Sequence, residues 1–149
     1  MQQRLGLASH VSPAAVVNKL SLQHRLFYAT RLHYLPVVTL DDLGRPWASI
    51  LTAHNGDPGF IQSSSAEHIH IQASIWDGDP ISYNLSNASS ALFAGVGVEP
   101  STARRNKFGG VISRSQQHGQ KLELDVNITY SLGYAYSHAL LHCAHHGRM

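Results

Sequence analysis

The segment LELDVNITYSL, residues 122–132, constrains the fold more than any other part of the chain. Apolar and polar side chains alternate along it. The apolar ones, which share one face, are Leu122, Leu124, Val126, Ile128, Tyr130 and Leu132. Successive side chains of a strand point to opposite faces, so this alternation predicts a long, half-buried antiparallel β-strand. The rest of the chain supplies further strand candidates.

Those candidates are short apolar runs bounded by turn residues. They are residues 35–40, 47–54, 60–64, 68–76, 91–99 and 108–115. The segments DDLGRP and NGDPG are rich in aspartate, glycine and proline, which favour turns between strands. About six or seven antiparallel strands joined by short turns favour a closed or partly closed β-barrel over a parallel sheet.

A helix is predicted before the strands. Ser12 is a suitable N-cap and Pro13 a suitable first helical residue, and apolar positions keep a helical period from there to about Arg31. A short piece of helix is also expected at residues 2–8. Residues 81–90 fit neither pattern clearly and stay ambiguous.

Composition limits the class of protein. A chain of 149 residues suits one domain, and a hydrophobic content of 43% supports a real core. A net charge of +2 is too weak to indicate a nucleic-acid binder. The single cysteine, Cys143, excludes an internal disulfide. No apolar run approaches the roughly 20 residues that span a membrane, and no signal peptide is recognisable. We therefore expect a soluble, cytoplasmic protein.

A block of positive charge follows the strand candidate at residues 91–99. Arg104, Arg105 and Lys107 stand beside a glycine pair. Arginine forks and lysine suit phosphate oxygens, and glycines let backbone N–H groups approach an anion. A solvated loop explains the same residues. Ser49 and the serines at 63–65 likewise suit phosphate donors or simple turn formers.

The histidines allow a metal site without requiring one. His68 and His70 share a strand face, and three tail histidines stand four and three residues apart at His138, His142 and His145, near Cys143. A non-metal role is the preferred interpretation for both groups. The chain shows no phosphate-binding loop, dinucleotide fingerprint, nucleophile elbow or catalytic triad, so no catalytic residue is assigned.

Taken in order, several segments resemble one known family. They are LPVVTLDDLGRPWASIL, GFIQSSS, GVGVEPSTARRNKFGGVI and the alternating strand. The succession is similar to the pyridoxamine 5′-phosphate oxidase-like proteins, which have the FMN-binding split barrel. It is most similar to a fungal and bacterial branch with an RRRNRxNG-type segment, which here reads ARRNKFGG. The resemblance spans roughly residues 16–133.

The resemblance implies a mainly β, Greek-key-like antiparallel split barrel with a flanking helix. It implies FMN in a groove at the interface of a homodimer, and a flavin-dependent oxidoreductase of unknown substrate. By position, the cofactor-binding residues would be Trp47, Ser49, Ile50, Leu51, Ser63, Ser64, His68, Arg104, Arg105 and Asn106. With the family in view, the charged block is expected to face the flavin groove.

The chain departs from the family in three places. Ala103 and Lys107 stand where the branch tends to have arginine, and after Gly133 the chain reads YAYSHALLHCAHHGRM instead of a GNCPKYI-like segment. We therefore expect a split-barrel domain at 1–133 and an atypical histidine-rich tail at 134–149. A spliced or frame-shifted tail would explain the change and would weaken flavin binding. The alternatives are a non-catalytic binding or dimerisation module and a metal-binding protein that uses the tail.

Overall fold

The computed structural model describes residues 16–87 and 92–134. Within these residues, seven strands and two helices follow one another. They are α1 (Leu22–Arg31), β1 (Tyr34–Leu40), β2 (Pro46–Thr52), β3 (Ile61–Ser65), β4 (His68–Ser74), α2 (Pro80–Asn87), β5 (Leu92–Glu99), β6 (Arg104–His118) and β7 (Lys121–Tyr134). A 3-10 turn at Pro100–Thr102 joins β5 to β6.

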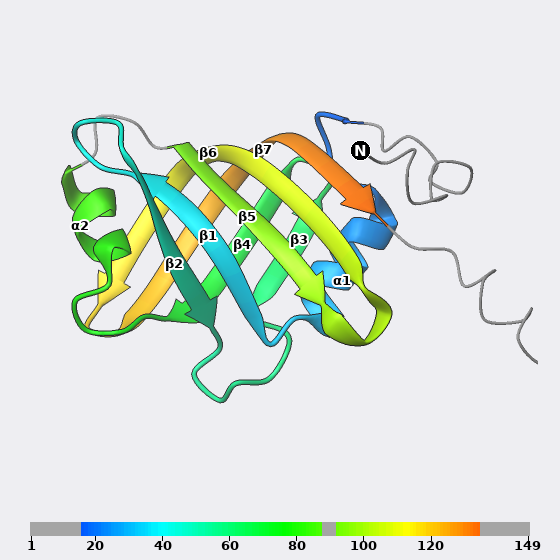
Figure 1. The fold of residues 1–149 in the computed structure, drawn as a ribbon, viewed down its shortest axis with the longest axis horizontal. Coiled ribbons are helices and arrows are strands. Elements are labelled where there is room, and N and C mark those ends of the chain that lie inside the picture. The colour runs from blue at the N-terminus through cyan, green and yellow to red at the C-terminus, as the bar shows by residue number, and fades with distance from the viewer. Residues whose placement is uncertain (1–15, 88–91, 135–149) are drawn as a thin grey trace, which may run out of the picture.

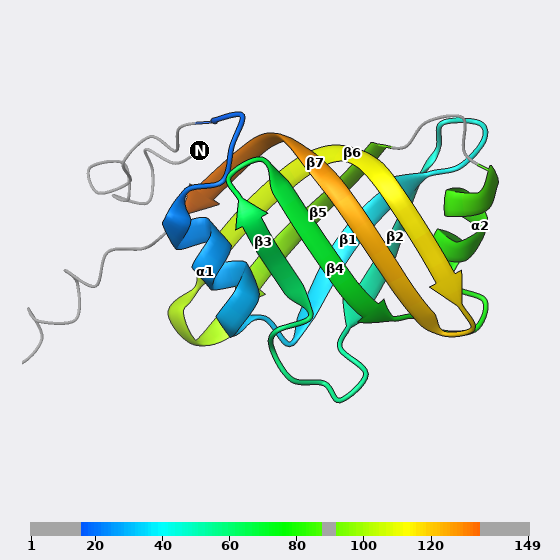
Figure 2. The same ribbon diagram turned by 180° about the vertical axis from the view of Figure 1, so that it is seen from behind.

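The strands form an antiparallel barrel, which confirms the fold class expected from the sequence. The strand order is β2-β1-β5-β6-β7-β4-β3. An additional pairing of β2 with β4 closes a ring of six strands, and β3 lies outside that ring. The closing contact is a single residue pair, Thr52 with Ser74, so the barrel is split along this seam. The two helices lie at opposite ends of the barrel (Figure 1, Figure 2).

The first helix begins later than the sequence predicts. It starts at Leu22, and the hydroxyl of Ser21 accepts a hydrogen bond from the backbone N–H of His24. The preceding segment instead pairs with the barrel, because Val17 exchanges backbone hydrogen bonds with Ser131 and Leu20 is buried. Tertiary pairing therefore overrides the helical period. The predicted cap and the short helix at 2–8 lie outside the described residues.

The long alternating strand is confirmed as β7, but its alternation changes phase near the end. The inner face holds Leu122, Leu124, Val126 and Ile128 as predicted. In the pairing with β6, Gly109 opposes Tyr130 and Gly110 opposes Ile128, so Thr129 is an extra, bulged residue. The bulge inverts the faces beyond it. The prediction for Tyr130 is wrong, because 40% of its surface is exposed, whereas Ser131 is buried.

The ambiguous segment is helical over residues 80–87 and forms α2. The carboxylate of Asp79 accepts hydrogen bonds from the backbone N–H of Ile81 and from the hydroxyl of Ser49. Ile81 and Asn84 are buried, and the amide of Asn84 donates to the hydroxyl of Thr39. These contacts hold α2 on β1 and β2.

The aromatic part of the core lies where α1 covers the end of the barrel. The ring of Phe108 stands edge-on to that of Tyr28 at 5.3 Å and lies 6.1 Å from that of Phe93. Gly95 and Gly97 of β5 leave room for these rings, because a Cβ at either would overlap aromatic side chains. Gly97 lets α1 approach β5 closely, and Gly95 makes room for the Phe108 ring of the neighbouring strand β6.

Candidate functional site

The charged block lies at the start of β6 and not in a loop between strands. Ala103, with φ of +54°, ends the preceding turn, and the strand begins at Arg104. Neighbouring residues of a strand face opposite ways, so the side chains of the charged block point to two different faces of the sheet. Arg105 and Lys107 are exposed on the outside of the barrel, and Asn106 is buried inside.

The side chain of Arg104 packs against α1. Its guanidinium lies 4.5 Å from the centre of the Phe27 ring and donates to the backbone carbonyl of Gln23 at 3.2 Å. Burial lowers the pKa of Arg104, although Glu99 nearby opposes that shift. This arginine therefore contributes to the packing of α1 on the barrel.

A buried polar cluster lies beneath α1. Within the described residues, His24 Nδ1, Tyr28 Oη and Asn106 Nδ2 are buried without a hydrogen-bond partner. Burial, and secondarily the charge of Arg104, lowers the pKa of His24, while burial raises that of Tyr28. Buried polar groups without partners usually meet ordered water or a ligand. His24 and Tyr28 were not singled out from the sequence, because nothing local distinguishes them from residues of an ordinary amphipathic helix.

The outer face of β1, β5, β6 and β7 carries an apolar groove. Its volume is about 230 Å³, and its lining residues are Val38, Leu40, Leu92, Phe93, Ala94, Gly109, Gly110, Thr129 and Tyr130. The Tyr130 ring lies against Gly109, where a Cβ would overlap it. Lys107 precedes Gly109 by two residues on the same side of β6, which places its backbone about 7 Å from that of Gly109. Arg105 precedes it by four residues, about 13 Å along the strand. Both cations therefore lie on β6 beyond one end of the groove, and neither is among its lining residues.

The remaining sequence-predicted residues lie apart in one protomer. Trp47 and Ser49 lie near α2, and Leu51 is fully buried in the core. Ile50 is exposed on the outside of β2. Ser63 accepts hydrogen bonds from Arg25 of α1 through its carbonyl and hydroxyl oxygens, and Ser64 is exposed. A single protomer therefore does not gather these side chains into one pocket.

His68 belongs to a charged group on the outside of β4, β6 and β7. His70 Nδ1 lies 2.6 Å from Asp125 Oδ1, His68 Nε2 lies 3.8 Å from the same oxygen, and Arg114 lies 3.6 Å from the other. One carboxylate thus serves three basic side chains. Across residues 16–87 and 92–134, no three His, Cys, Asp or Glu side chains are arranged to hold a metal ion. The tail histidines lie outside these residues.

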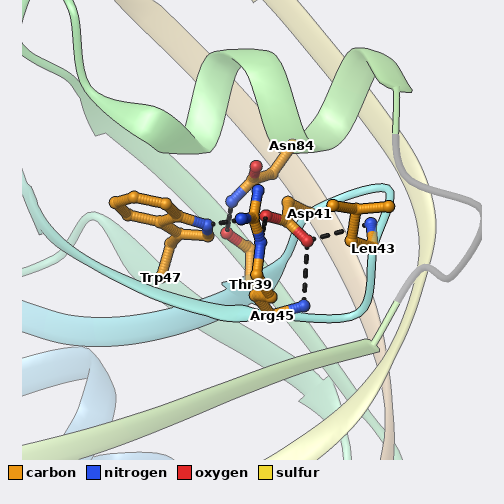
Figure 3. A network of polar contacts seen from close by, with 6 residues as sticks. All are labelled: Thr39, Asp41, Leu43, Arg45, Trp47 and Asn84. Carbon is orange, nitrogen blue, oxygen red and sulfur yellow. Dashed lines mark hydrogen bonds and ion pairs between the residues drawn. The ribbon is translucent and has the colours of Figure 1, made fainter.

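Trp47 is held by the turn between β1 and β2 (Figure 3). Asp41, which is 4% exposed, accepts hydrogen bonds from the backbone N–H groups of Leu43 and Arg45 and from the indole N–H of Trp47. The Arg45 side chain also donates to it at 2.7 Å. These bonds, the one from Trp47 first, lower the pKa of Asp41 to about 2. The carboxylate thereby fixes both turn and indole.

The Asp41 network predicts a specific acid sensitivity. A lowered folded-state pKa stabilises the protein above the unfolded value of 3.8, and this stabilisation is lost as pH falls toward about 2. We expect Asp41→Asn to be less stable at neutral pH and to lose less stability between about pH 4 and pH 2. Urea unfolding at a series of pH values measures both effects. Parallel pH profiles for the two proteins would contradict the prediction.

No helix in the described part of the chain is both long enough and apolar enough to cross a membrane.

Comparisons with known proteins show similarity at the level of the fold. No model of a known protein family matches the chain, and no curated protein matches it. The structure of a HupZ variant from Group A Streptococcus is similar, with a TM-score of 0.55 and 10% identity, over 77% of this chain and 99% of that one. An F420 reductase structure gives a TM-score of 0.48 and 10% identity, over 71% and 94%. At such low sequence identity, the structural similarity shows a shared fold and nothing about activity or ligands.

Proposed function

We propose that the chain is an FMN-binding split-barrel protein that acts as a homodimer and serves a flavin-dependent oxidoreductase reaction. The observation that carries the proposal is the apolar groove on the outer face of the barrel, with Lys107 and Arg105 at one end. The sequence resemblance to FMN-binding split barrels supports the same cofactor. FMN has the matching chemistry, because it joins a flat aromatic ring system to a phosphate.

The residues at the groove fit such a group. Ala94 has a small side chain, so a flat ring can approach the sheet closely there, beside the Tyr130 ring that covers Gly109. Tyr130 presents an aromatic ring at the same place, and 40% of its surface is exposed. Arg105 and Lys107 supply donors and positive charge for a phosphate. When bound, the flavin would supply the redox chemistry, and the protein would bind, orient and shield it.

The size of the groove supports a second copy of the chain. A volume of about 230 Å³ is below the roughly 300–1,000 Å³ of typical ligand pockets, so one protomer offers about half a site. The exposed apolar residues Val38, Leu92 and Val111 on this face would be covered in a dimer. We assign Ile50, Ser64 and His68 to the second wall, contributed by the partner copy.

A non-catalytic flavin-binding module is the second candidate. Of the residues that line the groove, Tyr130 alone carries a titratable side chain. A binding module needs no general acid or base, whereas many redox reactions with proton transfer do. Retained FMN without turnover of any reductant or substrate would favour this candidate.

The first test of FMN binding is visible absorbance of the purified chain with FMN, before and after desalting. We expect a retained flavin band, and a loss of affinity of at least about tenfold in the double variant Arg105→Ala, Lys107→Ala, because two charge-assisted contacts are removed. Arg114→Ala is the matched control, since this arginine is exposed on the same strand but pairs with Asp125. A band that washes away from the unaltered chain would overturn the proposal.

The shared site is tested by mixing two defective variants. One is the double variant above, and the other carries Ser64→Ala and His68→Ala. In a two-fold symmetric dimer, each mixed dimer has one intact site, so random mixing restores about a quarter of all sites. No recovery on mixing, or a monomer with FMN bound in sedimentation, would contradict the shared site.

A further inference from the structure

We propose that a second pocket, at the bulge of β7, binds a neutral ligand with adjacent hydroxyl groups, that is, a polyol. Its lining residues are Asn18, Glu67, Asn127, Ile128 and Thr129, and its volume is about 460 Å³. This volume lies within the roughly 300–1,000 Å³ of small-molecule sites. None of the residues of the buried cluster under α1 lines the pocket, and the pocket borders the Asp125 group, because Asn127 lies opposite His68.

Three segments far apart in the sequence converge on this pocket. Asn18 follows Val17, whose backbone pairs with Ser131 beyond the bulge. Glu67 lies in the turn between β3 and β4, and its carbonyl accepts a hydrogen bond of 2.8 Å from the N–H of Ile128. Asn127 lies on β7 opposite His68. Backbone hydrogen bonds therefore fix the positions of the polar side chains.

The donors and acceptors of the pocket select the ligand. Asn18, Glu67 and Asn127 are exposed, and within the described part of the chain their side chains form no hydrogen bond or ion pair, so their polar groups face solvent and are available. A carboxylate only accepts hydrogen bonds, whereas each amide both donates and accepts. An anion would be repelled by Glu67, and an ammonium ion would leave the amide N–H groups without acceptors. Neighbouring hydroxyl groups both donate and accept, so they satisfy all three side chains.

The pocket adjoins the proposed flavin groove. Thr129, the bulged residue, lines both depressions, and its hydroxyl is anchored to the carbonyl of Gly109 at 3.2 Å. A ligand in the polar pocket would therefore lie beside one in the apolar groove. We assign the polyol as a substrate, one carbinol group of which would be oxidised to a carbonyl, its two electrons and two protons being taken up by the bound flavin. That assignment rests on the proposed function, whereas the binding of a polyol in this pocket is independent of it.

Ribitol is the probe, and the flavin-free full chain labelled with ¹⁵N is the protein. We expect ribitol to shift the amide signals of Glu67, Ile128 and Thr129 saturably. Acetate and butylamine should shift them less. The double variant Glu67→Gln, Asn127→Ala should weaken ribitol binding at least about tenfold, because a charge-assisted acceptor and an amide are lost. Gln117→Ala, on the exposed β6–β7 hairpin, is the control, and the amide spectra report whether each variant is folded.

The outcomes separate this inference from the proposed function. No ribitol shift, or a stronger response to acetate or butylamine, would overturn the polyol site even if FMN binds. Ribitol binding in a chain that cannot retain FMN would support the pocket and count against the flavin function. Displacement of ribitol by FMN would mean that the pocket holds the ribityl chain of the cofactor, and the substrate assignment would fall.

Discussion

Replacing Phe108 by alanine is expected to destabilise the folded barrel by about 3–5 kcal/mol. The side chain is 0% exposed and joins α1 to β5 through its contacts with the rings of Tyr28 and Phe93. Alanine leaves a cavity that the surrounding strands, which are held by their ladders, cannot fill. Domains are stable by only about 5–15 kcal/mol, so the loss is a large fraction of the total.

Urea unfolding followed by circular dichroism measures the effect of the Phe108 substitution. Ser115→Ala is the control, because Ser115 lies on the same strand and is exposed. We expect this control to cost less than about 1 kcal/mol, mostly through strand propensity. Equal losses in the two variants would mean that the ring cluster under α1 does not contribute to stability as its packing indicates.

Two adjacent glycines of β6 should respond differently to alanine. A Cβ on Gly110 would overlap the backbone carbonyl of Asn127 on β7, so the two strands would have to separate. We expect Gly110→Ala to cost at least about 1–3 kcal/mol, the usual range for overpacking. The three atoms nearest to a Cβ on Gly109 all belong to the ring of Tyr130, which is exposed and can turn away. Gly109→Ala should therefore cost less than about 1 kcal/mol.

The Gly109 and Gly110 variants also distinguish effects on stability from effects on FMN binding. Rotation of the Tyr130 ring in Gly109→Ala changes the wall of the apolar groove, so FMN retention should fall although the barrel remains folded. Thermal unfolding and the desalting assay, applied to both variants, measure the two effects separately. A stable Gly110→Ala variant would contradict the bulged register, and unchanged FMN retention in Gly109→Ala would count against the groove as the flavin site.

Much of the fold was predictable from the sequence, because its signals are local. Residues 122–128 alternate strictly, and the segments DDLGRP and NGDPG mark turns by composition. The start of α1 was not predictable in this way, since Val17 and Leu20 have a helical spacing but are held by Ser131 and Ala66. A local period cannot report a backbone hydrogen bond to a distant strand.

The candidate site was less predictable than the fold. The charged block is recognisable in the sequence, where a solvated loop and a phosphate site both explain it and the resemblance favours the flavin groove. Its division between two faces of a strand was not expected, because the block was placed between strands. Only the start of β6 at Arg104 shows that Arg104 points toward α1 while Arg105 points outward. Lys107 belonged to the block. Tyr130 was assigned to the core because the glycine pair at residues 109 and 110 can mark a bulge but does not show that the extra residue falls on the opposite strand.

By itself, the sequence determined the fold class: an antiparallel barrel of short strands joined by tight turns, with a helix before them. Period-two alternation and turn chemistry act over a few neighbouring residues and need no partner to be recognised. Tertiary structure alone decided where the surface sites lie. The bulge at Thr129 depends on the register between β6 and β7. That register turns Tyr130 outward and creates both the apolar groove and the polar pocket, through contacts between residues distant in the chain.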